Sequence, residues 1–304
     1  MVICKGCQQA IAGAYVTALG ATWHAAHFCC AACHRPIGNG SFAEHQGAPY
    51  HPDCYRLQVA PRCAYCHKPL VGSYLVDHWG TKFCHEHTGT YPACRFCGRL
   101  VPPQHDAQVG RGASVRCPIC RASAIEQIAQ AQPLFTRLVQ WLNYQNLQYH
   151  NLNLRIELRN RTQLAEFLRH PGDTQALGAA LSTTYTQNGH VLRTTPDGVA
   201  ILRGLPTTLF QGVTIHELGH VWLAVHQVTG LPPWAEEGFC EFLAYHFWSQ
   251  MNTAESRYHA ENTERNPDPV YGAGFRRVAA VAQHTGFQRL ITTLRTAKEL
   301  PFAP

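Results

Sequence analysis

Charged residues are scarce in this chain of 304 residues, at 14%. No apolar run approaches the roughly 18 residues that a membrane-spanning helix needs, so we expect no membrane partner. The chain starts MVICKGC, which lacks the pattern of a targeting segment. Cysteine almost vanishes after residue 120, where only Cys240 remains. The hydrophobic content of 45% is ordinary for a globular protein, and the length predicts two or three domains.

The first 120 residues, by contrast, hold all the other cysteines. Five Cys-x-x-Cys pairs occur, at 4/7, 30/33, 63/66, 94/97 and 117/120, and most are followed at fixed intervals by a further His or Cys pair. This spacing is typical of zinc sites and not of a secreted disulfide framework. Because zinc thiolates persist in a reducing compartment, the spacing also predicts a cytoplasmic protein.

Residues 1–58 contain two abutting four-ligand patterns and resemble a LIM domain. Two residues separate the members of each pair, and two separate His27 from Cys30. Cys29 is left over, because only Cys30 keeps the two-residue gap to Cys33. The predicted ligands of the two structural zinc ions are Cys4, Cys7, His24 and His27 for the first, and Cys30, Cys33, His51 and Cys54 for the second.

Residues 59–121 repeat the pattern less regularly and are predicted to be a LIM-like module with two more zinc ions. Six residues separate His87 from Cys94 where a regular LIM domain has two. His85 remains an alternative ligand to His87, although the two-residue gap favours His87. The predicted ligands are Cys63, Cys66, Cys84 and His87 for one ion, and Cys94, Cys97, Cys117 and Cys120 for the other.

The formal net charge of +6 gives little support for nucleic-acid binding. Residues 1–120 contain ten Lys and Arg and five Asp and Glu. Ligand cysteines are thiolates, so the four predicted zinc centres would carry 0, −1, −1 and −2. The net charge of this region then falls to about +1, so we expect no nucleic-acid partner.

The stretch 214–241 predicts a catalytic metal site. His216 and His220 are four residues apart, so on a helix they share one face. Two such imidazoles can hold one Zn²⁺, and Glu217 can act as base on a water that the ion activates. A catalytic zinc needs three protein ligands and one open position. Prolines at 232 and 233 end the first helix, and Glu237 on the second helix is the predicted third ligand.

These two segments resemble the gluzincins, metallopeptidases with an HExxH helix and a later glutamate ligand. The sequence Trp-Ala-Glu-Glu-Gly-Phe at 234–239 is similar to their glutamate helix, and this likeness favours Glu237 over Glu236. Because many gluzincins use a Tyr or His to stabilise the oxyanion, the resemblance also makes Tyr271 a candidate catalytic residue. Glu241 follows Glu237 by four residues and is a candidate acceptor for the outer N–H of a zinc-bound histidine. We expect Glu236 to interact with the N-terminal end of its helix.

Residues 122–304 predict an α+β domain, in which a small antiparallel sheet packs on helices. Residues 151–159 alternate in polarity and predict a half-buried strand, and 199–205 predict the strand just before the zinc helix. That strand is a candidate edge for an extended peptide. The predicted helices are 122–132, 133–147, 161–169, 206–227, 234–251, 253–266, 273–285 and 287–298.

The whole architecture resembles the plant DA-one-type growth-control peptidases, LIM-domain proteins with a C-terminal gluzincin-like domain. The LIM block, the HELGH helix, Glu-Glu-Gly-Phe-Cys at 236–240 and Tyr-Gly-Ala-Gly-Phe-Arg at 271–276 carry the likeness over nearly the full chain. The resemblance implies ubiquitin-interacting motifs before the LIM domain, activation by ubiquitylation and selective cleavage of proteins. Because only three residues precede Cys4 in this sequence, we expect a short homologue without those motifs and with uncertain ubiquitin dependence.

The expected function is zinc-dependent hydrolysis of peptide bonds in protein or peptide substrates, with Glu217 as general base. The LIM modules are expected to recruit a protein partner or to restrain the active site. The alternative is a LIM-type interaction scaffold with an inactive peptidase domain. The presence of every required catalytic group in the sequence favours the enzyme.

Overall fold

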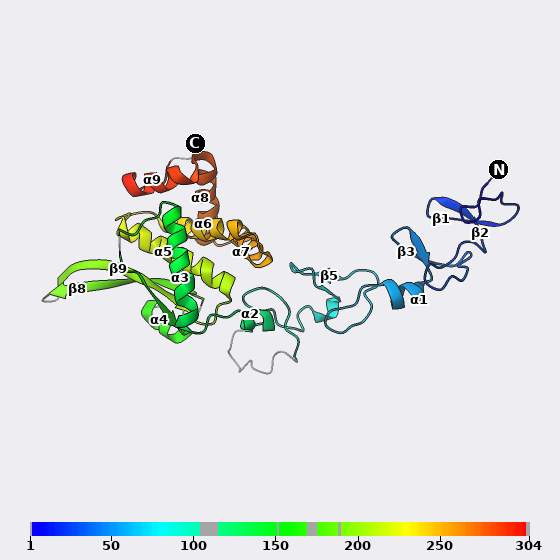
Figure 1. Ribbon diagram of the computed structural model, residues 1–304, viewed down its shortest axis with the longest axis horizontal. Coiled ribbons are helices and arrows are strands. Elements are labelled where there is room, and N and C mark those ends of the chain that lie inside the picture. The colour runs from blue at the N-terminus through cyan, green and yellow to red at the C-terminus, as the bar shows by residue number, and fades with distance from the viewer. Residues whose placement is uncertain (1, 104–114, 151, 169–174, 188–189, 302–304) are drawn as a thin grey trace. The chain divides into compact units, whose positions relative to one another are not determined.

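The computed structural model describes residues 2–103, 115–150, 152–168, 175–187 and 190–301 (Figure 1). By its internal contacts the chain divides into two compact units, Met1–Pro92 and Ala93–Pro304. The fourth cysteine group, which starts at Cys94, therefore lies in the larger unit. The boundaries expected after residues 58 and 121 remain predictions.

The first unit consists of small hairpins and short helical turns. Its strands are β1 (Tyr15–Ala18), β2 (Ala21–His24), β3 (Ala43–His45), β4 (Ala48–Tyr50), β5 (Leu75–Val76) and β6 (Lys82–Phe83), paired antiparallel in sequence order. Its helical turns are α1 (Pro52–Cys54), the π-helical turn η1 (Tyr55–Val59) and the 3₁₀ turn η2 (His85–His87). One buried cluster contains only Ala18, Phe28, Cys30 and Ile37. Such a small core stabilises a fold weakly unless metals add to it.

The second unit packs helices on one three-stranded sheet, which confirms the α+β class. Its helices are α2 (Pro118–Ala122), α3 (Ile128–Tyr144), α4 (Arg161–Leu168), α5 (Thr207–Val225), α6 (Pro233–Met251), α7 (Ala254–Arg265), α8 (Tyr271–Thr285) and α9 (Phe287–Ala297). Its strands are β7 (Arg155–Arg159), β8 (Gly178–Gln187) and β9 (His190–Leu202). Most bounds lie within two or three residues of the predicted ones.

The sheet is mixed, so the expectation of a wholly antiparallel sheet was wrong. Its order is β7-β9-β8. β8 and β9 form an antiparallel hairpin, and β7 pairs with the other side of β9. β7 runs parallel to β9 because the chain reverses direction twice between them, once in the connection that contains α4 and once at the hairpin. The strand before the zinc helix is therefore central and has neighbours on both sides. It cannot be the peptide-binding edge that the sequence predicted.

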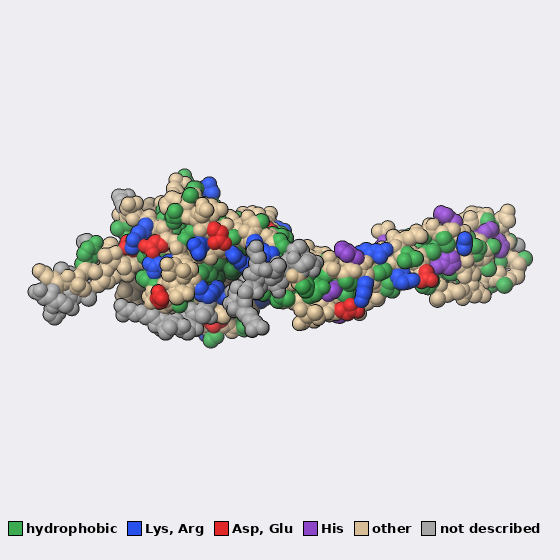
Figure 2. Space-filling view, turned by 90° about the horizontal axis from the view of Figure 1, so that it is seen from below, with side chains coloured by type: hydrophobic (Ala, Val, Ile, Leu, Met, Phe, Trp, Pro, Cys, Tyr) green, Lys and Arg blue, Asp and Glu red, His purple; other side chains and the backbone are tan. Residues whose placement is uncertain are grey.

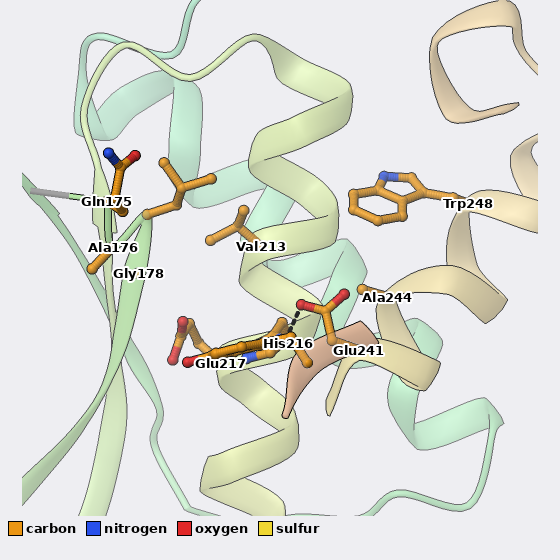
Figure 3. Close-up of a pocket in the computed structure, with 11 residues that line it drawn as sticks. Gln175, Ala176, Gly178, Val213, His216, Glu217, Glu241, Ala244 and Trp248 are labelled. Atoms are coloured by element: carbon orange, nitrogen blue, oxygen red, sulfur yellow. Dashed lines mark ion pairs between the residues drawn. The ribbon is translucent and has the colours of Figure 1, made fainter. Parts of the chain in front are cut away.

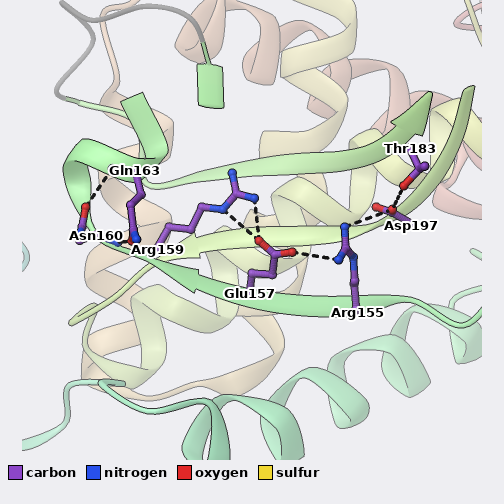
Figure 4. Close-up of polar contacts among 7 residues, drawn as sticks. All are labelled: Arg155, Glu157, Arg159, Asn160, Gln163, Thr183 and Asp197. Atoms are coloured by element: carbon purple, nitrogen blue, oxygen red, sulfur yellow. Dashed lines mark hydrogen bonds and ion pairs between the residues drawn. The ribbon is translucent and has the colours of Figure 1, made fainter. Parts of the chain in front are cut away.

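Polar side chains join the strands of this sheet (Figure 4). Glu157 accepts from Arg159 at 2.7 Å and pairs with Arg155 at 3.2 Å. Arg155 also pairs with Asp197 on β9 at 3.3 Å, and Thr183 on β8 donates to the same carboxylate. The chain of contacts crosses all three strands and supports their register.

The region 122–147 contains one long helix where two were predicted. Helix α3 begins at Ile128 and continues through Pro133. Gln127 and Gln130 form a reciprocal capping box, which starts the helix upstream of the proline. The apolar face continues across Pro133 in the buried residues Ala131, Phe135, Leu138 and Leu142. Burial of this face offsets the hydrogen bond that the proline removes.

Helices α5, α6 and α8 cross at close range because glycines lie at their contacts. A Cβ atom on Gly238 of α6 would lie 2.4 Å from the backbone carbon of Gly274 on α8. A Cβ atom on Gly274 would lie 2.2 Å from the carbonyl oxygen of Trp234. The two helices thus approach backbone to backbone. The contact sets the positions of Glu237, which adjoins Gly238, and of Tyr271, three residues before Gly274.

The fourth cysteine group and the segment after it join the helical body through backbone and side-chain hydrogen bonds. Arg116 donates to the carbonyl of Gly204 at 3.0 Å, and the Ile125 N–H donates to Leu205 O at 2.9 Å. Arg95, between two of the cysteines, donates to Gln175 at 2.7 Å. The Arg95 contact reaches the segment that leads into β8, and the other two reach the connection between β9 and α5.

The surface of the larger unit carries both signs of charge. On the face seen in Figure 2, its Lys and Arg side chains are interspersed with Asp and Glu, while histidines gather over the smaller unit. Among the described helices, none combines the length and the apolar character that crossing a membrane requires.

The glycine contact gives a stability prediction. Gly238→Ala or Gly274→Ala should lower the free energy of unfolding of the larger unit by about 1–3 kcal/mol, because the added methyl overlaps fixed backbone. Helix propensity alone predicts the opposite sign, a gain of up to about 1 kcal/mol. Thermal and denaturant unfolding measure the change. Ala280→Ser, which adds one atom at an exposed position of α8, is the control and should be nearly neutral. A stabilised Gly238→Ala protein would contradict the close crossing.

Candidate metal centre

The two histidines of the HExxH segment lie on one face of α5. This helix is apolar on almost every side and is buried along most of its length, so packing holds its backbone rigidly. The rings of His216 and His220 are 5.1 Å apart, and their Nε2 atoms are 3.3 Å apart. The helical spacing therefore points both ring nitrogens at one place.

Helix α6 brings Glu237 to the same place. Its Oε2 atom lies 3.2 Å from His216 Nε2 and 3.4 Å from His220 Nε2. The three atoms form a nearly equilateral triangle. Ligands about 2.0–2.1 Å from a tetrahedral zinc ion are separated by about 3.3–3.4 Å, so the triangle fits three of the four zinc ligands.

The electrostatics of the three groups also fit a cation. Glu237 Oε2 is buried, and no described residue donates a hydrogen bond of good geometry to it. Burial raises the pKa of Glu237, but the nearby His216 and His220 outweigh it and lower that pKa to about 2. A carboxylate that stays ionised beside two imidazoles is the donor set of a catalytic zinc site.

Two further carboxylates hold the outer nitrogens of the imidazoles. His216 Nδ1 lies 3.3 Å from Glu241 Oε1, the contact that the helical spacing predicted for Glu241. His220 Nδ1 lies 3.1 Å from Glu236 Oε1. Such contacts select the tautomer whose Nε2 atom is free to bind a metal.

The contact of Glu236 was missed by the sequence interpretation, which gave that residue a role at the end of its helix. The structure shows no side-chain cap at the start of α6. The available signal was the adjacent pair of acids at 236 and 237, but spacing along one helix cannot show which of two neighbours faces the other helix.

Glu217 lies beside the ligand triangle. Its side chain faces the hollow in Figure 3, opposite the start of β8, and it is 8% exposed. Burial raises the pKa of Glu217 above its ordinary value. A carboxyl group with a raised pKa exchanges protons more readily near neutral pH, as a general base that later acts as an acid must do.

Tyr271, the first residue of α8, borders the same space. Asp268 accepts from the Val270 and Tyr271 N–H groups at 2.8 and 2.9 Å, which fixes the start of the helix. The tyrosine ring lies 6.4 Å from the His216 ring. Burial raises the pKa of Tyr271 to about 12, so its hydroxyl stays protonated and can donate a hydrogen bond.

The structure also brings the four predicted structural ligand sets together. In each set the four candidate atoms lie within 4.8 Å of one another, and the groups use Cys30 and His87 and not Cys29 and His85. The Cys7 Sγ to His24 Nδ1 distance is 3.5 Å and the Cys66 Sγ to Cys84 Sγ distance is 3.8 Å. These distances match edges of a zinc tetrahedron with Zn–S about 2.3 Å and Zn–N about 2.0–2.1 Å.

Two known protein families match parts of the chain. The LIM domain family matches residues 4–59, and the DA1-like family, described as Protein DA1, matches residues 158–264. The second match includes the HExxH segment and Glu237.

Three relatives are plant proteins. Protein DA1-related 1 of Arabidopsis thaliana is 30% identical over 294 residues, which span 83% of this chain and 52% of that protein. Protein DA1 of the same plant is 25% identical, over 98% of this chain and 68% of that protein. LIM domain-containing protein HDR3 of Oryza sativa subsp. japonica is 28% identical, over 86% and 59%. The chain thus spans between half and about two thirds of the length of these relatives. It combines a LIM domain with a DA1-like domain and is a homologue of the plant DA1 proteins.

Proposed function

We propose that this chain is a zinc-dependent peptidase of the gluzincin type that hydrolyses peptide bonds in protein substrates. The observation that carries the proposal is the triangle of His216, His220 and Glu237 ligand atoms, with edges of 3.2–3.4 Å, beside the buried carboxyl group of Glu217. The half-buried triangle offers a cation three ligands, and surface hollows border its residues.

The roles of the side chains follow from their positions. A zinc ion, when bound, supplies Lewis acidity for the scissile carbonyl and lowers the pKa of a water molecule toward about 7. Glu217 takes the proton of the attacking water and delivers it to the leaving amine. Tyr271 donates a hydrogen bond to the oxygen on which negative charge develops. Glu241 and Glu236 orient the two imidazoles.

The smaller unit is proposed to recruit protein partners or substrates, because LIM domains generally bind proteins. Its structural zinc ions, held by thiolates, support a location in a reducing compartment such as the cytoplasm. Four structural zinc ions are proposed in all, three in the smaller unit and one in the larger.

The general-base role predicts a loss of turnover without loss of metal. Glu217→Gln should lower kcat for a denatured generic protein by roughly 10²–10⁴-fold while its zinc content stays unchanged. The control is Glu299→Gln, the same substitution at an exposed position far in sequence from the candidate site, and it should keep wild-type turnover. Full activity of zinc-loaded Glu217→Gln would refute the role of Glu217. An inactive, zinc-loaded wild type would favour the scaffold with an inactive peptidase domain.

Metal content tests the ligand sets. Native mass spectrometry should find five zinc ions per chain, one for each group of candidate ligands. Glu237→Ala should retain only four, because two neutral imidazoles bind the ion too weakly to keep it. Glu299→Ala should retain five. A wild-type chain that saturates with four zinc ions would contradict the catalytic site.

The start of β8 gives a test of how Glu217 is positioned. A Cβ atom on Gly178 would lie 2.7 Å from Glu217 Cγ and Oε1. Gly178→Ala should therefore displace the flexible carboxyl group and lower kcat by roughly 10- to 100-fold. Zinc content and melting temperature should stay at wild-type values, because the displaced atoms can move at little cost. Unchanged kcat would show that Glu217 does not act from this position.

A further inference from the structure

The fourth cysteine group lies in the larger unit, whereas the other three groups belong to the smaller one. Its members are Cys94, Cys97, Cys117 and Cys120. All four side chains are buried, while each of the other groups has at least two ligands that are less buried. The Sγ atoms of Cys97 and Cys117 are 3.5 Å apart, close to the roughly 3.8 Å expected for two thiolates on a tetrahedral zinc ion.

The last two cysteines of this group lead directly to the start of the HExxH helix. Cys117 caps α2, Cys120 lies within it, and Ser123 ends it. The Ser123 carbonyl accepts hydrogen bonds from both the backbone N–H and the hydroxyl of Thr207, the first residue of α5, at 2.9 Å each. A helix of five residues has little stability of its own, so metal ligands at its start would hold it in place.

Arg116, the neighbour of Cys117 in the chain, reinforces this contact with α5. Its guanidinium donates to the Gly204 carbonyl at 3.0 Å and pairs with Glu126 at 3.1 Å. A Cβ atom on Gly204 would lie 2.7 Å from Arg116 Nη1, so the guanidinium lies directly against the turn that precedes α5. The position of Arg116 depends on where Cys117 is held, because the two residues are adjacent.

The first two cysteines reach the opposite side of the candidate site. Arg95, which adjoins Cys94, donates to the Gln175 side chain at 2.7 Å. Gln175 begins the described segment that enters β8. Three residues later, a Cβ atom on Gly178 would lie 2.7 Å from Glu217 Oε1, so the start of β8 packs against the proposed general base. Arg95 therefore anchors the strand that borders Glu217.

A third link runs through α7. A Cβ atom on Gly98 would lie 2.8 Å from the Tyr258 hydroxyl oxygen, so the turn after Cys97 contacts this side chain. The Tyr258 ring lies 5.4 Å from the His259 ring, and His259 stacks on Trp248 at 5.1 Å. The Trp248 N–H donates to the Thr208 carbonyl in the first turn of α5 at 3.0 Å. Gln175 and Trp248 both border the hollow beside His216 (Figure 3).

We propose that a metal ion on the fourth cysteine group positions the HExxH helix and the start of β8, with Arg116 and Arg95 as positioning residues. Four thiolates on one ion fix two chain segments that lie about twenty residues apart in sequence, and both segments contact the walls of the candidate centre. Ligands of a metal site must be held to within about 0.5 Å, so a small shift of α5 lowers the affinity of that site for its cation. The inference goes beyond the proposed function, because it needs the candidate metal centre but not peptide hydrolysis.

The test compares the loss of one structural metal at two places. Cys97→Ser removes a ligand of the fourth group, and Cys66→Ser removes a ligand of the third group. Competition with a chelator then measures zinc affinity at the His216 centre, identified as the ion that is absent when Glu237→Ala is added. This affinity should fall roughly 10- to 100-fold in Cys97→Ser, because its ligands are less well positioned. It should stay at the wild-type value in Cys66→Ser.

Hydrogen exchange distinguishes positioning from general stabilisation. In Cys97→Ser the amides of residues 175–182 and 204–216 should exchange faster, while α9 keeps its wild-type protection. In Cys66→Ser the exchange of the larger unit should match that of the wild type. Equally faster exchange throughout the larger unit of Cys97→Ser would mean that the metal only stabilises the fold, and would overturn the positioning role.

Two arginine variants keep the test decisive if Cys97→Ser folds poorly, because they leave the four thiolates intact. Arg116→Ala should speed exchange at 204–208 and lower zinc affinity at the His216 centre, and Arg95→Ala should speed exchange at 175–178. Arg289→Ala, the matched substitution at an exposed position of α9, should change neither.

Wild-type affinity and wild-type exchange in both arginine variants would overturn the proposal. A zinc-loaded wild type that fails to cleave would overturn the peptidase function alone, because none of these measurements requires cleavage.

Discussion

The close approach of one carboxylate oxygen to two imidazole nitrogens is the constraint on which the candidate site depends. Glu237 Oε2 lies 3.2 and 3.4 Å from His216 and His220 in a buried setting. Desolvated donor atoms at this separation are favourable only when a cation or protons lie between them. The packing of α5 against α6 holds these three atoms close together. The favourable free energy of that helix packing therefore offsets the cost of keeping the three polar side chains at this separation.

A second helix contact, between α6 and α8, fixes the position of Tyr271. Gly238 and Gly274 let α6 and α8 meet at backbone distance, and each glycine lies within three residues of a group that borders the centre. A methyl group at either position would separate the helices and shift Glu237 relative to Tyr271. The two glycines therefore couple the stability of the helical body to the geometry of the site.

The hollow beside His216 and Glu217 (Figure 3) depends on parts of the larger unit that are distant in sequence. Trp248 is fixed by the first turn of α5, and Gln175 is held by Arg95 from the fourth cysteine group. A metal in that cysteine group would keep Arg95 in place at the wall of the hollow, because ligand and arginine are neighbours in the chain. The grouping of residues 93–304 into one compact unit agrees with this connection.

Local patterns in the sequence determined the candidate ligand sets, the α+β class and most helix bounds, because fixed spacings such as HExxH and Cys-x-x-Cys act within one or two turns. The tertiary structure decided what depends on separate elements. No local spacing encodes the parallel pairing of β7 with β9 or the contact of Glu236 with His220. The same holds for the contacts that join the fourth cysteine group to the helical body. Each arises from where the chain folds back, and burial over the whole unit, not the pattern of any one segment, selects that path.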